Sequence, residues 1–218
     1  MVRRALCSVL VATGVAIAPP VRAQQAQLPD QAPPSIAAPG ADPIVTDNPT
    51  LRARLTRIAQ RSPSWRKALD ALRVTGRRVF VLTPDQVVVA ESLDGDSPAE
   101  FDPTIVAAAA PIPAPDDRVE VVLVVVNVEL IRDAHRVRRS LPVELDADLD
   151  RILVHEVYGH ALPYLLAGDM SGRCADPEPG QRPSEACSIR RENVVRRELG
   201  LGRRTGYDLG GLALASVR

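Results

Sequence analysis

The chain has 218 residues, of which 45% are hydrophobic, and it carries 27 basic and 27 acidic side chains. This length suits one domain with tails. The balanced charge does not favour a nucleic-acid or anionic-membrane partner, and we expect neither.

The first 23 residues have the pattern of a secretory signal. Arg3 and Arg4 precede an apolar run over residues 6–18, and residues 21–23 offer small side chains for cleavage after Ala23. The apolar run is too short for a transmembrane helix. The sequence therefore predicts a periplasmic or secreted protein with no stable membrane insertion after signal cleavage.

A flexible segment is predicted between the signal and the domain. Residues 24–48 are rich in Gln, Ala and Pro and hold few large apolar groups, a composition typical of a disordered tether. The predicted domain, residues 49–218, opens with two helical patterns. The first follows Asn48, and the second has Ser62 as N-cap and Gly76 past its end.

The middle of the chain predicts a small sheet. Residues 77–92 hold two β-rich runs separated by Thr83-Pro84-Asp85, which is a hairpin pattern. Residues 92–117 are rich in Asp, Pro and Ala and are expected to form a loop. Residues 118–131 are Val-rich and apolar on both faces, which favours a central strand.

Two helical patterns follow this strand. They cover residues 146–169 and residues 184–200, and Gly200 suits the C-cap of the second. Helices, a small sheet and two more helices follow one another along the chain. This order predicts an α+β fold.

Two histidines flank a glutamate in HEVYGH, residues 155–160. The His-Glu-x-x-His signature of zinc peptidases has its histidines four apart on one helix face, whereas His155 and His160 are five apart. Each residue of an α-helix turns about 100°, so these rings would lie about 140° apart on a straight helix. Two histidines that only decorate a helix are the alternative to a metal site.

A single π-turn would remove this obstacle, because it absorbs one residue without advancing the helix face. The sequence favours such a bulge near Tyr158 and Gly159. Glycine tolerates unusual backbone angles. Pro163 has no N–H to bond the carbonyl of Gly159. We therefore predict that the two histidines converge on one metal ion.

A catalytic zinc ion usually has three protein ligands. Glu192 lies within the apolar stripe of the last predicted helix, where a carboxylate needs a strong partner. A metal would serve as that partner, and an ion pair with Arg196, one turn on, is the alternative. Asp169, Asp176 and His135 are further candidates, although His135 is most simply an exposed residue.

Export also affects the cysteines. Cys7 leaves with the signal, so Cys174 and Cys187 remain and are expected to pair in an oxidising compartment. Their disulfide would close a loop between the two ligand-bearing helices, a closure worth about 3 kcal/mol in the chain-entropy model. It would hold these helices together, staple an exposed loop, or do both.

The segment HEVYGHAL, with ENVVRRELGLGRRTGY downstream, resembles the zincin-like metallopeptidase domains of bacterial effectors and Rhs-type toxins. That family typically has a His-Glu-x-x-His helix, a Glu-Asn pair heading an Arg-containing helix, and a closing Arg and Tyr. The resemblance implies a small mixed sheet against the active-site helix. It implies these roles: zinc ligands His155, His160 and Glu192, general base Glu156, and oxyanion-stabilising Tyr207. Tyr207 would otherwise be an ordinary packed tyrosine.

These residues together predict an exported zinc peptidase that acts on a peptide or protein substrate. Zinc would activate water, and Glu156 would move its proton. The strand at 119–128 could pair with an extended substrate if it lay at a sheet edge. Two other functions remain open: a non-catalytic binding protein on a decayed zincin scaffold, and a metal-dependent hydrolase of cell-wall crosslinks.

Overall fold

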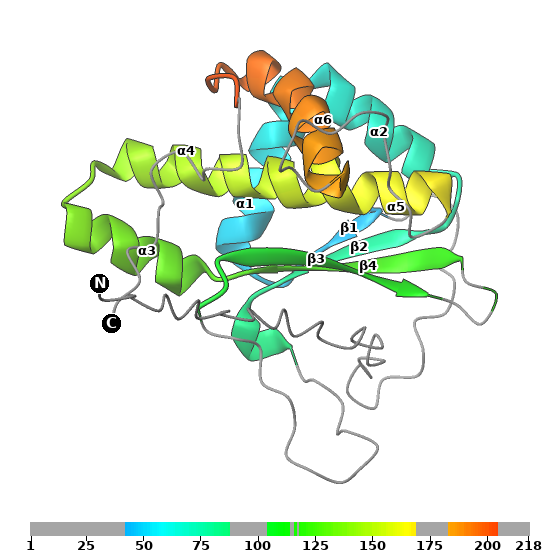
Figure 1. Ribbon diagram of the computed structural model, residues 1–218, viewed down its shortest axis with the longest axis horizontal. Helices are drawn as coiled ribbons and strands as arrows, with labels where there is room; N and C mark the ends of the chain where they lie inside the picture. Colours follow the sequence, from blue (N-terminus) through cyan, green and yellow to red (C-terminus); the bar gives the residue numbers. More distant parts are fainter. Residues whose placement is uncertain (1–41, 88–103, 114–115, 117, 169–182, 205–218) are drawn as a thin grey trace, which may run out of the picture.

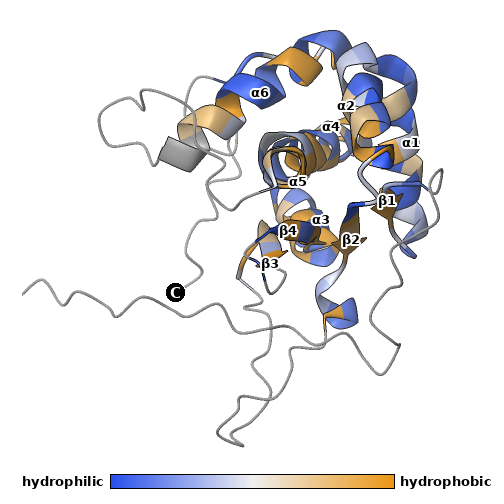
Figure 2. Ribbon diagram, turned by 90° about the vertical axis from the view of Figure 1, so that its right-hand side faces the viewer, coloured by the Kyte–Doolittle hydropathy of each residue, from blue (hydrophilic) through white to orange (hydrophobic). Residues whose placement is uncertain are grey.

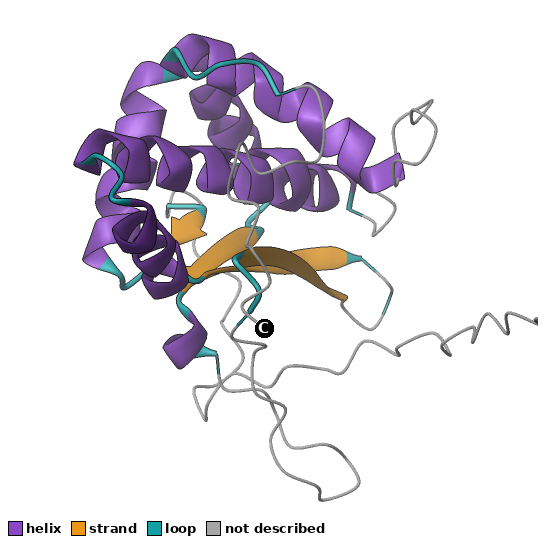
Figure 3. Ribbon diagram, turned by 60° about the vertical axis from the view of Figure 1, so that its left-hand side comes forward, coloured by secondary structure: helices purple, strands orange, loops and turns teal. Residues whose placement is uncertain are grey.

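The computed structural model describes residues 42–87, 104–113, 116, 118–168 and 183–204, with only the backbone described at 113 and 183–185. Helices pack on one face of a four-stranded mixed sheet (Figures 1 and 3). The predicted α+β class is confirmed. No described helix has the length and apolar composition needed to cross a membrane.

The sheet has the strand order β1-β2-β4-β3. Its strands are β1 (Ile44–Val45), β2 (Arg78–Leu82), β3 (Ala107–Pro113) and β4 (Val119–Val126). The strands β1, β2 and β4 run parallel, and β3 pairs with β4 in the antiparallel direction. The Val-rich strand is therefore central, as predicted, and it cannot offer a free edge to a substrate.

Two expectations about the strands were wrong. Residues 107–113 form the edge strand β3 rather than a loop, because Ala109 and its neighbours pair with the Val-rich β4. The β1 strand lies within the last residues of the predicted tether, and Ile44 is buried. The run after Gln86, which was predicted to pair with β2 in a hairpin, lies mostly outside the described residues, and β1 and β4 already pair with β2 on its two sides.

The first two helices begin directly after Asn48 and Ser62, where the sequence patterns predicted their starts. The side chain of Asn48 accepts from backbone N–H groups at the start of α1 (Pro49–Arg61), and that of Ser62 does so at the start of α2 (Pro63–Arg73). Each cap satisfies donors that the first helical turn leaves free.

A helix that the sequence analysis missed follows β4. The side chain of Asn127 accepts from the N–H of Leu130 and starts α3 (Val128–Arg138). The central strand is consequently shorter than predicted. The same helix buries His135, which was expected to be exposed.

A long helical rod crosses the sheet (Figure 1). It comprises α4 (Pro142–Leu153), the π-helix η2 (Val154–Ala161) and α5 (Leu162–Ala167). The last described helix, α6 (Pro183–Leu199), packs against η2, and β3 and β4 pack against η2 as well. Gly200 ends α6 with a positive φ of 74°, as its predicted C-cap role requires.

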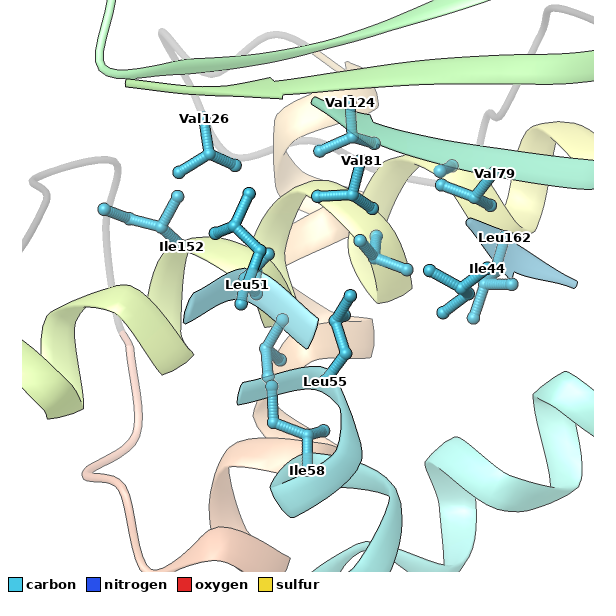
Figure 4. Packing of buried hydrophobic residues seen from close by; sticks show 14 of the residues in the cluster. Ile44, Leu51, Leu55, Ile58, Val79, Val81, Val124, Val126, Ile152 and Leu162 are labelled. Atoms are coloured by element: carbon cyan, nitrogen blue, oxygen red, sulfur yellow. The ribbon is translucent and has the colours of Figure 1, made fainter. Parts of the chain in front are cut away.

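The hydrophobic core lies between the sheet and the helices (Figure 4). The outer sides of α1 and α2 are largely hydrophilic (Figure 2), although some charged residues of other helices are buried, among them Asp150, Glu192 and Arg196. The labelled core residues come from both layers: Ile44, Leu51, Leu55, Ile58, Val79, Val81, Val124, Val126, Ile152 and Leu162. This packing fixes the rod on the sheet and thereby positions η2.

Ion pairs hold the α4 part of the rod to α1. Arg54 bonds Asp146, and Arg57 bonds Asp150. Burial raises the pKa of Asp150, while the hydrogen bond and charge of Arg57 oppose that rise. The rod is therefore anchored on its polar side as well as on its apolar one.

Candidate metal centre

The predicted change in helix type is present at the HEVYGH motif. The π-helix η2 covers Val154–Ala161, and the N–H of Leu162 bonds the carbonyl of Val157, five residues earlier. The single π-turn that was predicted is thus part of a longer π-helical segment. It brings the Nε2 atoms of His155 and His160 to 3.3 Å from each other.

Gly159 matters here for a reason other than the predicted one. Its φ is not positive, so its backbone freedom is not used. A Cβ atom at this position would lie 3.0 Å from Cβ and 3.2 Å from the carbonyl oxygen of Ser188. Glycine therefore allows α6 to approach η2 closely, and this approach brings Ser188 and Glu192 to the histidines.

Ser188 fixes the orientation of His160. Its hydroxyl donates its single proton to the carbonyl of Gly159 at 3.1 Å, since a carbonyl can only accept. The same oxygen lies 2.9 Å from Nδ1 of His160, so this ring donates its Nδ1–H to Ser188. The hydrogen-bond network thus assigns the proton of His160 to Nδ1 and the lone pair to Nε2.

Glu192 has the corresponding effect on His155. Its Oε2 lies 2.6 Å from Nδ1 of His155 and accepts the proton of that nitrogen. Nε2 of His155 therefore also carries a lone pair. The two nitrogens face each other at 3.3 Å, and either a proton or a metal cation between them would remove the repulsion of their lone pairs.

The distance between the two nitrogens fits zinc. Nitrogens bound at about 2.0–2.1 Å around a tetrahedral zinc ion lie roughly 3.3–3.4 Å apart. The Nε2 atoms of His155 and His160 are separated by 3.3 Å. The donor set and its spacing therefore suit two ligands of one zinc ion.

Glu156 lies beside the same point. Its Oε1 is 4.0 Å from Nε2 of His155, and the residue is 9% exposed. His160 stacks on Tyr164, with ring centroids 6.5 Å apart. A carboxylate thus lies next to the two converging nitrogens, and an aromatic ring packs on one of the histidines.

The position of Glu192 differs from the one expected for a ligand. It contacts Nδ1 of His155, on the side of the ring away from His160, and it is fully buried. Arg196 lies 3.4 Å from its Oε1, and Arg204 lies 3.4 Å from its Oε2. The alternative ion pair with Arg196 is therefore present. In this arrangement Glu192 contacts Nδ1 of His155 and does not face the point where the two Nε2 atoms converge.

Arg196 is itself buried beside this carboxylate. Burial lowers the pKa of its guanidinium, and the charge of Glu192 opposes that shift. The guanidinium also donates from Nε to the carbonyl of Gly202 at 2.8 Å. Arg196 therefore joins Glu192 to the chain that follows α6.

Arg204 and Ser188 were missed by the sequence reasoning. Both contact Nδ1 of a histidine, Arg204 at 3.1 Å from His155 and Ser188 at 2.9 Å from His160. The signal for Ser188 was its position one helical turn before Glu192 on α6. Arg204 lies in the downstream segment that carried the resemblance, where no role had been given to it.

The other predicted residues are distributed as follows. His135 bonds Asp148 at 3.1 Å, a pairing between α3 and α4. Cys187 is disulfide-bonded, and its predicted partner Cys174 lies outside the described residues. Asp169, Asp176 and Tyr207 also lie outside the described residues. Within the described part of the chain, no three His, Cys, Asp or Glu residues are grouped so as to hold a metal ion.

No family model, no curated protein and no solved structure matches this chain.

Proposed function

We propose that this protein is an exported zinc-dependent peptidase with Glu156 as its general base. The observation that supports this proposal best is the convergence of two oriented Nε2 lone pairs, 3.3 Å apart, beside a buried carboxylate. A helix that only displayed two histidines would not need a π-helical segment or a hydrogen-bond partner on each Nδ1.

The proposed roles follow from this geometry. His155 and His160 would hold zinc through Nε2, and the metal would polarise the scissile carbonyl and acidify a water molecule. Oε1 of Glu156, 4.0 Å from Nε2 of His155, is close enough to accept the proton of that water. Glu156 would then pass the proton to the leaving amine.

The third ligand has to come from elsewhere than the present position of Glu192. Asp169 and Asp176 remain candidates.

The expected substrate strand, β4, is central, so a peptide substrate would have to pair with an edge strand instead. One of the two edge strands is β3, and it packs against η2. An extended peptide could pair along this edge. Pro111 and Pro113 carry no N–H donor, so the pairing would use Ala107–Ala110.

Metal analysis and one variant test the proposal. Purified protein should hold one zinc ion per chain and cleave an unfolded protein substrate. The Glu156→Gln variant should keep the zinc and lose turnover by about 10²–10⁴-fold, because it lacks only the base. Glu120→Gln, at an exposed position on β4, is the matched control and should retain full turnover.

Each contrary outcome points to a different function. A parent protein that binds no zinc would favour a non-catalytic binding role on a decayed site. Cleavage of peptidoglycan crosslinks without cleavage of unfolded protein would favour a cell-wall hydrolase. Equal turnover of Glu156→Gln and the parent would remove the base role.

A further inference from the structure

The chain that follows α6 is folded back onto that helix by side chain to backbone bonds. Nδ2 of Asn193 donates to the carbonyl of Arg204 at 2.8 Å, and the N–H of Arg204 donates to Oδ1 of Asn193 at 2.8 Å. Arg196 donates to the carbonyl of Gly202. These bonds place Arg204 beside Glu192 without using its guanidinium.

The guanidinium of Arg204 is buried at the back of the histidine pair. The residue is 7% exposed, and its Nη1 lies 3.4 Å from Oε2 of Glu192 and 3.1 Å from Nδ1 of His155. Nδ1 of His155 already donates to Oε2 of Glu192, so Arg204 and His155 are two donors that share one carboxylate oxygen.

Sharing this oxygen restricts where the carboxylate can lie. Arg196 approaches the other oxygen, Oε1. Arg204 is thus the cation that acts on the oxygen contacting His155. Without it, Oε2 could turn toward Arg196 and leave Nδ1 of His155 without its acceptor.

We propose that Arg204 is a positioning residue for the zinc site: it holds Glu192 against Nδ1 of His155 and thereby presents Nε2 of His155 to the metal. This inference rests on the proposed function, because it explains how His155, one of the proposed zinc ligands, is oriented. Loss of a group that orients a metal-binding histidine typically lowers metal affinity by roughly 10–100-fold.

The Arg204→Met variant tests this role. It keeps the backbone bonds to Asn193, so the chain after α6 should keep its path. We expect zinc affinity, measured by competition with a chromophoric chelator, to fall by about 10–100-fold. Arg203→Met, an exposed neighbour, is the matched control and should bind zinc like the parent. Arg204→Lys, which keeps the charge but not the planar fork, should fall between them.

A second readout separates positioning from a general effect on folding. The chain contains three histidines, so a long-range ¹⁵N–¹H spectrum of the metal-free protein shows three imidazoles. Arg204→Met should change the Nδ1–H signature of His155 and leave that of His160, which bonds Ser188, unchanged. With Glu192→Gln, the double variant should lose little more affinity than either single variant, because Arg204 acts through Glu192.

The outcomes distinguish this inference from the proposed function. If the parent binds one zinc ion, and Arg204→Met matches it in zinc affinity and in the His155 signature, the positioning role is wrong and the zinc site stands. If the parent binds no zinc while the His155 signature still changes, the proposed function is wrong and the hydrogen-bond role of Arg204 remains. Additive losses in the double variant would also overturn the inference.

Discussion

Two buried histidine–carboxylate pairs of the described residues differ in what surrounds the second nitrogen of the histidine. His135 uses Nε2 to bond Asp148 at 3.1 Å, and its Nδ1 is buried with no hydrogen-bond partner among the described residues. His155 uses Nδ1 to bond Glu192 at 2.6 Å, and its Nε2 faces His160. A histidine–carboxylate pair alone is therefore a packing feature, and only a second converging donor makes it a candidate metal centre.

The helix type around each pair accounts for this difference. Asp148 lies in the regular α4 helix and also bonds Arg151, one turn further along the same helix. His155 lies in the π-helix η2, where the wider turn brings a residue five positions away to the same face. Asp148 and His155 belong to one continuous rod in which the helix type changes between them, whereas His135 lies on α3 and Glu192 on α6.

Removing each histidine in turn should give the largest contrast. His155→Ala should lower zinc affinity by more than the roughly 10–100-fold that loss of an orienting residue costs, because a direct ligand is lost. His135→Ala should leave zinc affinity unchanged and lower the free energy of unfolding by about 1–3 kcal/mol, since Asp148 loses a buried partner. Isothermal titration with zinc and urea unfolding of both variants measure the contrast.

The opposite pattern would contradict this comparison. If His135→Ala lost zinc and His155→Ala kept it, the metal site would have to be placed between α3 and α4. If neither variant lost zinc, the metal would not use the π-helix at all.

The close packing of α6 against η2 at Gly159 offers a second test of the comparison between the two histidine–carboxylate pairs. In Gly159→Ala the new Cβ would meet Cβ, the carbonyl oxygen and Cα of Ser188 at 3.0–3.3 Å, so the backbone of α6 has to move. We expect a loss of about 1–3 kcal/mol in the free energy of unfolding, which exceeds the helix propensity that alanine gains. Weaker zinc binding should accompany it, because Ser188 would no longer hold His160.

Gly202→Ala is the matched control for this variant. Apart from its chain neighbours, a Cβ at Gly202 would meet no heavy atom of the described residues within 4 Å, so stability and zinc binding should stay as in the parent. A Gly159→Ala protein with full stability and full zinc affinity would show that the close approach of α6 does not position the site.

The sequence predicted the π-turn because the spacing of the two histidines left no other way to share an ion. It did not predict which nitrogen of His155 would meet Glu192, because helix periodicity places a residue on a face but does not orient a ring. The role of Arg204 was missed for a related reason, since it depends on the backbone bonds to Asn193 beyond the helix. The strand β3 was missed because its alanines and prolines become a strand only through pairing with β4.

The smallest expected effect concerns the scaffold away from the histidines. Glu198, near the end of α6, accepts hydrogen bonds from the hydroxyls of Ser62 and Ser64 and from the N–H of Ser64, which joins α6 to the start of α2. Burial tends to raise the pKa of Glu198, but these hydrogen bonds outweigh it and lower the pKa below the ordinary value of 4.5. The ionised carboxylate therefore stabilises the fold at neutral pH.

The sign of the pH dependence follows from this lowered pKa. Stability contributed by Glu198 is fully present above pH 4.5, the ordinary glutamate pKa, and is lost as pH falls through the lower pKa of the folded state. Glu198→Gln should lower the free energy of unfolding by about 1 kcal/mol at pH 7, and urea unfolding should show this difference shrinking as the pH falls below 4.5. Zinc affinity should not change, because the described contacts of Glu198 join α6 to α2 and do not involve the histidines. A Glu198→Gln variant that lost zinc would show that the scaffold and the site are coupled through α6, and the contrast between the two regions would have to be given up.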